Sequence, residues 1–176
     1  IKVLPKDATP IDFAYMIHEQ IGHRMTGCKV NSKMVPIVTK LKNGDIITID
    51  VVIGYKGYQG DAAWTYAVGE IDDDKKYLME HTEKALYEGL KFAKPGNRVG
   101  DISFAVQEYA EKHNLGIVRE LCGHGIGKEM HEEPEVPNFG TPNTGARLKP
   151  GMVICIEPML TFGHRSEEHT SELQSL

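Results

Sequence analysis

Hydrophobic and polar residues follow two different periods along this chain of 176 residues. Alternation with a period of two predicts one hairpin that turns at Asn31-Ser32 and another, over residues 45–69, that turns at Tyr55-Lys56-Gly57. Helical spacing and short apolar runs predict the remaining elements. These are helices over residues 7–22, 73–93 and 101–113, and strands over residues 1–4, 116–121 and 152–158. The mixture predicts an α+β fold.

The first predicted helix has clear signals at both ends. Thr9 is a favourable N-cap, Pro10 suits the first helical position, and Gly22 is a typical C-terminal stop. Each of the three helices is expected to turn one apolar face towards a core. The inward side chains are expected to be Ile11, Ala14, Tyr15, Ile17 and His18 in the first, Leu78, Ala85, Leu86 and Ala93 in the second, and Ile102, Val106 and Tyr109 in the third.

A carboxylate, Asp50, interrupts the aliphatic run of residues 46–53. Burying a lone charge is costly unless a cation or a hydrogen-bond donor meets it. A turn at Tyr55-Lys56 would place Asp50 directly opposite Asp61, whereas a loop that includes Gly57 would need a bulge to bring both carboxylates to one face. A metal ion between the two would stabilise them; the alternative is a pair of solvent-facing acids.

Two histidines lie in a glycine-rich segment, CGHGIGKEMHEEP (122–134), as His124 and His131. Glycines beside His124 allow the backbone to crowd a site that a Cβ would obstruct. Further along, LKPGMVICIE (148–157) repeats the pattern of LKNGDIITID (41–50), and both segments end in a carboxylate. The repeat predicts a pseudo-symmetric fold in which acidic residues meet at the centre.

Imidazole and carboxylate groups together predict a metal centre, because such ligands suit Mn, Fe, Co or Zn. A metal there would activate water and polarise a carbonyl, so the residues predict a metal-dependent hydrolase. The sequence contains no apolar run of membrane-spanning length, and its three cysteines without CxxC spacing fit the cytoplasm. Residues 1–44 carry seven Lys or Arg against three Asp or Glu, whereas the whole chain has a net charge of −5.

The motifs IDVVIGYKGYQGD, CGHGIGKEMHEEPEVPNFG and LKPGMVICIEPM give residues 45–164 a resemblance to the C-terminal half of type I methionine aminopeptidases, which have the pita-bread fold. This resemblance implies removal of N-terminal methionine from peptides or nascent chains, with two divalent ions. It implies a set of metal ligands, in which Asp61 bridges the ions. The implied ligands are Asp50, Asp61, His124 and Glu157.

The same resemblance assigns roles to two further residues. His131 would contact the scissile peptide and stabilise its developing negative charge. Met130 would line the pocket for the substrate methionine. A substrate-contacting histidine and a bridging glutamate of the family lie outside the matching segment, so the expectation is a truncated half-fold with one weak metal site and background turnover.

Residues 1–49 resemble a different family. The pattern LPKDATPIDFAYMIHEQIGHRMTGCKVNSKMVP, followed by LKNGDI, is similar to the TGS domain, a small β-grasp unit, of bifunctional (p)ppGpp synthetase/hydrolases. The resemblance implies tRNA or ribosome binding, and the positive charge of residues 1–44 would favour RNA. Residues 46–49 are expected to pair in parallel with residues 2–4, with the TGS helix covering Ile47 and Ile49.

Both families contain a strand similar to LKNGDI, so the chain is expected to pass from one to the other within residues 41–50, as a chimera. Residues 165–175, RSEEHTSELQS, resemble the in-frame translation of a common sequencing adapter. Residues 165–176 are therefore expected to be an artefactual, disordered tail. Besides the aminopeptidase fragment, two alternatives remain open: an RNA-binding TGS module, and a pita-bread relative that only binds proteins.

Overall fold

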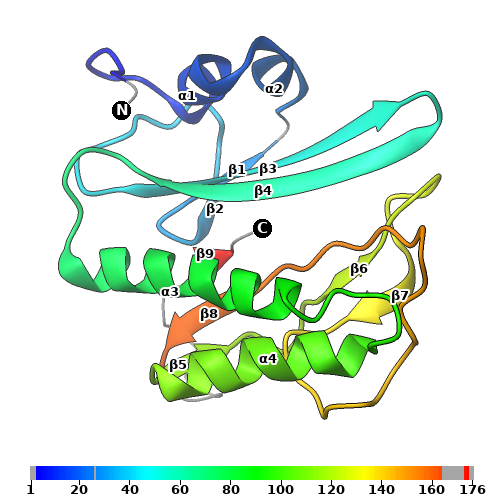
Figure 1. Ribbon diagram of the computed structural model, residues 1–176. Helices are drawn as coiled ribbons and strands as arrows, with labels where there is room; N and C mark the ends of the chain where they lie inside the picture. The colour runs from blue at the N-terminus through cyan, green and yellow to red at the C-terminus, as the bar shows by residue number, and fades with distance from the viewer. Residues whose placement is uncertain (1–2, 26, 164–172, 175–176) are drawn as a thin grey trace.

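A long hairpin divides the molecule into two layers in the computed structural model, which describes residues 3–25, 27–163 and 173–174 (Figure 1). Two short helices lie on one side of the hairpin, and two longer helices with the strands that follow them in the chain lie on the other. The elements are α1 (Pro10–Ile17), α2 (Glu19–Arg24), β1 (Cys28–Val30), β2 (Lys33–Val35), β3 (Ile46–Tyr55), β4 (Tyr58–Ala67), α3 (Asp73–Leu90), α4 (Val99–Lys112), β5 (Leu115–Ile117), β6 (Gly123–Gly125), β7 (Glu132–Val136), β8 (Met159–Phe162) and β9 (Leu173–Gln174).

The hairpin β3–β4 turns through two residues, Lys56 and Gly57, whose φ angles of 50° and 82° favour glycine at the second position. Asp50 consequently lies opposite Ala63, and Asp61 lies opposite Val52. Of the two loops considered, a turn at Tyr55-Lys56 is wrong, and the loop that includes Gly57 is the one observed. A bulge is unnecessary, because the observed register already places Asp50 and Asp61 diagonally on one face of the sheet.

The two faces of β3 bury different side chains, as alternation predicts. Ile47 and Ile49 pack with Phe13 and Ala14 of α1, which confirms the expected helical cover. Ile46 points the other way, into the core of the C-terminal part. On that face the buried hydroxyls of Thr48 and Thr65 satisfy each other at 2.9 Å, and Asp50 follows two residues later. The face therefore becomes more polar along the strand.

The edge of β3 is paired with β1, not with the N-terminus. Lys29 lies opposite Thr48 and Val30 opposite Ile47 in an antiparallel ladder, giving the strand order β2-β1-β3-β4. The expected parallel pairing with residues 2–4 is wrong for the described residues 3 and 4, which form no strand. The physical reason is burial: Val3 is 80% exposed, whereas Cys28 and Val30 both reach the core beneath α1.

The predicted first helix is two helices. Thr9 and Pro10 begin α1 as expected, and the Thr9 N–H donates to Asp12 Oδ2 at 2.8 Å. His18 then adopts an extended backbone, and its Nδ1 accepts from the Gln20 N–H at 3.1 Å to cap α2. Gly22 lies within α2, so its predicted role as the stop is wrong. Tyr15 is exposed, because Phe13 takes the inward position and meets the ring edge of Tyr66.

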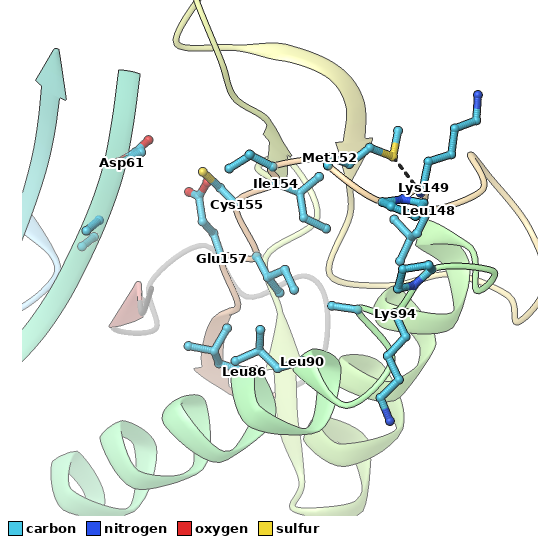
Figure 2. A pocket seen from close by; sticks show the side chains of 18 residues that line it. Asp61, Leu86, Leu90, Lys94, Leu148, Lys149, Met152, Ile154, Cys155 and Glu157 are labelled. Atoms are coloured by element: carbon cyan, nitrogen blue, oxygen red, sulfur yellow. Dashed lines mark hydrogen bonds between the residues drawn. The ribbon is translucent and has the colours of Figure 1, made fainter. Parts of the chain in front are cut away.

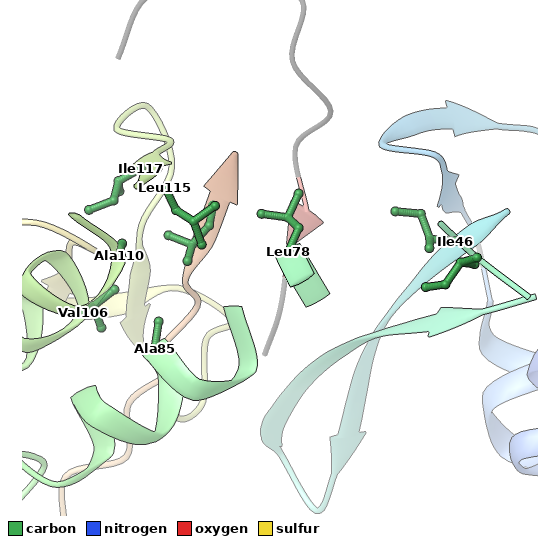
Figure 3. Packing of buried hydrophobic residues seen from close by; sticks show 9 residues of the cluster. Ile46, Leu78, Ala85, Val106, Ala110, Leu115 and Ile117 are labelled. Carbon is green, nitrogen blue, oxygen red and sulfur yellow. The ribbon is translucent and has the colours of Figure 1, made fainter. Parts of the chain in front are cut away.

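The C-terminal core lies between α3, α4 and the short strands (Figure 3). Leu78 and Ala85 of α3 pack with Val106 of α4 and with Leu160 of β8. Helix α3 begins where Asp72 accepts from the Lys75 N–H at 2.8 Å, and it ends at Leu90, three residues before the predicted end. No helix in the described parts of the chain combines the length and apolar character that a membrane span needs.

Two strand predictions and part of the tail prediction need correction. Strand β5 ends at Ile117, so the predicted strand over residues 116–121 is shorter and begins one residue earlier. The segment predicted as a strand over residues 152–158 is extended but makes a single bridge, Gly125 with Ile154, and regular pairing begins only at Met159. Within the predicted disordered tail, Leu173–Gln174 form β9 beside β8; residues 164–172 and 175–176 lie outside the described residues.

Candidate metal centre

Four side chains with metal-ligating atoms converge beside the hairpin. Asp61 comes from β4, His124 comes from β6, and Cys155 and Glu157 come from the extended segment before β8. One ligating atom from each lies within 4.8 Å of those of the others. Figure 2 shows Cys155 and Glu157 side by side, turned towards Asp61 on the neighbouring strand. Segments that are far apart in the sequence therefore build one site.

The distances within this cluster suit a bound cation. His124 Nε2 lies 3.5 Å from Asp61 Oδ2 and 3.3 Å from Glu157 Oε1. Ligand atoms on a tetrahedral ion with bonds of about 2.0–2.2 Å stand roughly 3.4 Å apart. Glu157 Oε1 is buried, and the Asp61 side chain is 11% exposed. Holding two shielded carboxylates together is unfavourable without a compensating positive charge, so the donor set fits a divalent metal.

The tautomer of His124 also fits metal binding. Its Nδ1 lies 2.9 Å from the carbonyl oxygen of Gly125. Because a carbonyl oxygen can only accept, Nδ1 carries the proton of that hydrogen bond. A metal ion beside the two carboxylates would therefore bind His124 through the lone pair of Nε2. A backbone carbonyl that fixes the second ring nitrogen is a common partner of metal-bound histidine.

Close packing of two backbone segments brings the ligands together. The Cys155 N–H donates to the His124 carbonyl at 2.7 Å, which ties the extended segment to β6. Gly123 makes this approach possible, because a Cβ there would lie 2.2 Å from the Cys155 carbonyl oxygen. The prediction that glycines beside His124 allow crowding is confirmed at this position.

The remaining predicted residues lie around the four-residue cluster. Asp50 is outside the cluster but shares the face of Asp61. Desolvation raises the pKa of Asp50, and the adjacent Asp61 carboxylate raises it further. The ring of His131 stands edge-on to that of His124, with centroids 4.3 Å apart, and His131 is exposed. Met130 is 36% exposed and does not line the pocket described next.

A pocket of about 560 Å³ opens beside the ligands. Asp61, Cys155 and Glu157 form part of its wall. The opposite wall is largely apolar and includes Leu86 and Leu90 of α3 (Figure 2). An apolar side chain could therefore lie next to the ligand cluster.

Cys155 is the site residue that the sequence prediction missed. Burial raises the pKa of its thiol to about 11, and the nearby carboxylates act in the same direction. The alternating pattern ICIEP, residues 154–158, could have identified Cys155 as a site residue. In an extended segment Cys155 and Glu157 share a face, while Ile154 and Ile156 take the other. Both isoleucines do pack against a hydrophobic core.

Comparison with known proteins supports a family assignment. Residues 13–171 match the model of metallopeptidase family M24. This match begins inside the range that resembles a TGS domain and runs through residues 41–50, where the passage between the two families was expected. Methionine aminopeptidase 1 of Bacillus subtilis is 49% identical over 149 residues, which cover 85% of this chain and 56% of the relative. A methionine aminopeptidase of Clostridium acetobutylicum is 50% identical over 70% of this chain and 49% of its own length.

Solved structures agree with the sequence matches. The crystal structure of methionine aminopeptidase from Rickettsia prowazekii has a TM-score of 0.83 at 30% identity, covering 96% of this chain and 80% of that one. The enzyme from Thermotoga maritima gives 0.81 at 34% identity, over 96% of this chain and 76% of its own. The fold is thus the pita-bread fold, and the chain spans about half the length of the curated relatives it matches. The chain belongs to metallopeptidase family M24.

Proposed function

We propose that this chain carries the divalent-metal centre of a methionine aminopeptidase, which removes methionine from the N-terminus of a peptide or nascent chain. The observation that carries the proposal is the convergence of Asp61, His124 and Glu157 from three separate segments, at 3.3 and 3.5 Å. Matches to methionine aminopeptidases support it. When bound, a divalent ion at these ligands supplies an activated water and a polarised carbonyl.

The side chains around the ion would divide the remaining work. Asp61, His124 and Glu157 would hold one ion, whereas Asp50 and the shared Asp61 alone are too few ligands to hold a second. His131, beside His124, donates a hydrogen bond to the scissile carbonyl and stabilises its developing charge. The family resemblance also implies that Met130 contacts the methionine side chain of the substrate, although Met130 lies outside the pocket beside the ligands. Two observations support these roles. Asp50 and Asp61 share one face of the sheet, and the ring of His131 lies against that of His124.

Calorimetry with Mn(II) or Co(II) tests the metal centre. The full chain is expected to bind one ion weakly, because a pair of carboxylates alone rarely holds a second transition metal against water. His124→Ala removes the imidazole and is expected to abolish the heat of binding. Two tight sites would contradict the single-site proposal, and unchanged binding by the variant would contradict the assigned centre.

Release of methionine from the peptide Met-Gly-Met measures the turnover of the chain, which is expected to stay at background level, and tests the role of His131. Turnover above background that is lost in His131→Ala would support the catalytic assignment and overturn the expectation of an inactive fragment. Turnover that persists unchanged in His131→Ala would contradict the role of His131.

The RNA-binding alternative rests on the sequence pattern of residues 1–49. Such binding is expected to weaken steeply as salt rises, because Lys and Arg would pair with phosphates. A gel-shift titration with tRNA at two salt concentrations tests it. Binding that is insensitive to salt would contradict the alternative.

A further inference from the structure

We propose that Cys155 is a sulfur ligand of the metal centre. The site would then offer one thiolate, one imidazole and two carboxylates, a set that suits borderline-soft divalent ions such as Zn(II), Co(II) and Cd(II). This inference rests on the proposed function in one respect, since it requires that a metal bind beside His124. It goes beyond the family resemblance, which implied oxygen and nitrogen ligands only.

The position of the sulfur carries the inference. Cys155 Sγ lies within 4.8 Å of ligating atoms of Asp61, His124 and Glu157, and these atoms lie within 4.8 Å of one another. Four donors from three chain segments therefore lie close enough together to share one ion. Figure 2 shows the sulfur beside the Glu157 carboxylate, on the side of the segment that faces Asp61.

The backbone fixes this orientation. Ile156 is buried and Ile154 packs against the same core, with Leu86 and Leu148, on the opposite face of the segment. Rotating the segment to withdraw Cys155 would expose both isoleucines. The rotation would also break the hydrogen bond from the Cys155 N–H to the His124 carbonyl. Cys155 is therefore held towards the site by packing on one face and by pairing along one edge.

The chemistry of a thiol adds selectivity to the site. As the sulfur–metal bond forms, the S–H bond breaks and its proton passes to solvent. A thiolate ligand favours Zn(II), Co(II) and Cd(II), whereas Mn(II) is bound well by carboxylate and water ligands without a thiolate. Replacing Cys155 with serine is expected to lower the affinity for Cd(II) strongly and the affinity for Mn(II) little. Cys122 offers a matched control, because it is a partly exposed free thiol outside the four-residue cluster.

Absorption spectroscopy of the full chain loaded with Co(II) tests the inference. Visible d–d bands report that the ion is bound, and a near-ultraviolet thiolate-to-cobalt charge-transfer band reports sulfur ligation. The wild type and Cys122→Ser are expected to show both signals, and Cys155→Ser is expected to keep the d–d bands and lose the charge-transfer band. A wild type with d–d bands alone would overturn the sulfur ligand and leave the proposed metal centre standing. A wild type with neither signal would overturn both.

X-ray absorption at the zinc edge gives a second test that needs no variant at Cys155. The Zn(II)-loaded wild type is expected to show one sulfur neighbour at about 2.3 Å besides nitrogen and oxygen neighbours at about 2.0–2.2 Å. The same sulfur is expected in Cys122→Ser. A spectrum with nitrogen and oxygen alone would overturn the inference, and so would loss of the sulfur signal in Cys122→Ser.

Discussion

Two clusters of histidine in this molecule differ in what surrounds the rings. The ring of His81 on α3 lies tilted against the rings of Tyr77 and His113, with centroids 4.1 and 4.3 Å away. Its Nδ1 shares a hydrogen bond of 2.9 Å with the hydroxyl of Tyr109. His124 instead faces the carboxylates of Asp61 and Glu157, with its other nitrogen bonded to a backbone carbonyl. The first histidine is enclosed by aromatic rings, and the second by anionic oxygen atoms.

The difference shows why a histidine alone says little about chemistry. Aromatic rings pack against the faces of the His81 ring, and the hydroxyl of Tyr109 forms a hydrogen bond with its Nδ1. These contacts account for His81 as a packing residue. Around His124 the neighbouring oxygens repel one another, and the imidazole nitrogen that faces them can share a cation with them. We therefore expect metal to bind at His124 and not at His81.

The largest expected effect separates these two histidines. His124→Ala is expected to abolish Co(II) binding, because it removes the one nitrogen ligand of the cluster. His81→Ala is expected to bind Co(II) as the wild type does. Cobalt d–d absorption during titration measures both variants. Loss of binding in His81→Ala with a wild-type thermal unfolding profile would contradict the comparison.

Metal binding is also expected to stabilise the fold. An ion that binds only the folded state adds RT ln(1 + [L]/Kd), about 2.7 kcal/mol at a concentration of 100 Kd. The ligands join β4, β6 and the segment before β8, so unfolding must release the ion. Chemical denaturation with and without Mn(II) measures the gain, and His124→Ala is the control in which the gain is expected to vanish. An equal gain in the variant would place the ion elsewhere.

Local patterns in the sequence predicted the strand faces, the first helix start and one hairpin turn correctly. Alternation along β3 correctly separated Ile47 and Ile49, which pack under α1, from Ile46, which enters the other core. The N-cap at Thr9 and the turn at Asn31-Ser32 also follow from side-chain and φ preferences within a few residues.

Long-range choices were not predictable in the same way. Strand β1 pairs with β3 because Cys28 and Val30 are buried there, whereas Val3 near the N-terminus is exposed. A local sequence pattern does not compare the burial of two distant segments. At His18 the helix breaks, and Ile17 before the break and Ile21 after it both pack against the core that includes Ile47. Cys155 was missed because its role depends on contact with β6, although its shared face with Glu157 was visible in the alternation.

A smaller effect concerns the aromatic cluster. Tyr109→Phe keeps the ring that stacks on His113 at 4.2 Å and removes the hydroxyl that bonds His81. One hydrogen bond of this kind contributes about 0.5–1.5 kcal/mol. The free energy of unfolding is expected to fall by that amount, and Co(II) affinity is expected to stay the same. A changed Co(II) affinity would show that the two histidine clusters are coupled, contrary to the comparison.

The smallest expected effect is a dependence of stability on pH at His81. Desolvation lowers the pKa of His81 below its ordinary value of 6.5, the nearby charges of His113 and Lys84 lower it further, and Glu80 acts in the opposite direction. The unfolded chain therefore takes up the proton more readily than the folded one. It follows that the contribution of His81 to stability is fully present above the unfolded pKa and is lost as pH falls through that value towards the folded one.

His81→Gln removes this titration while keeping a polar side chain on α3. The difference in unfolding free energy between wild type and His81→Gln, measured by denaturant titration, is expected to shrink between about pH 7.5 and pH 5. His23→Gln is the control, because His23 lies on α2, outside the aromatic cluster, and contacts the ring of Tyr15. If this difference in unfolding free energy stays constant over the range, folding does not change how readily His81 takes up a proton. In that case the aromatic neighbours of His81 would not affect its charge, and the contrast with His124 would lie entirely in the carboxylates.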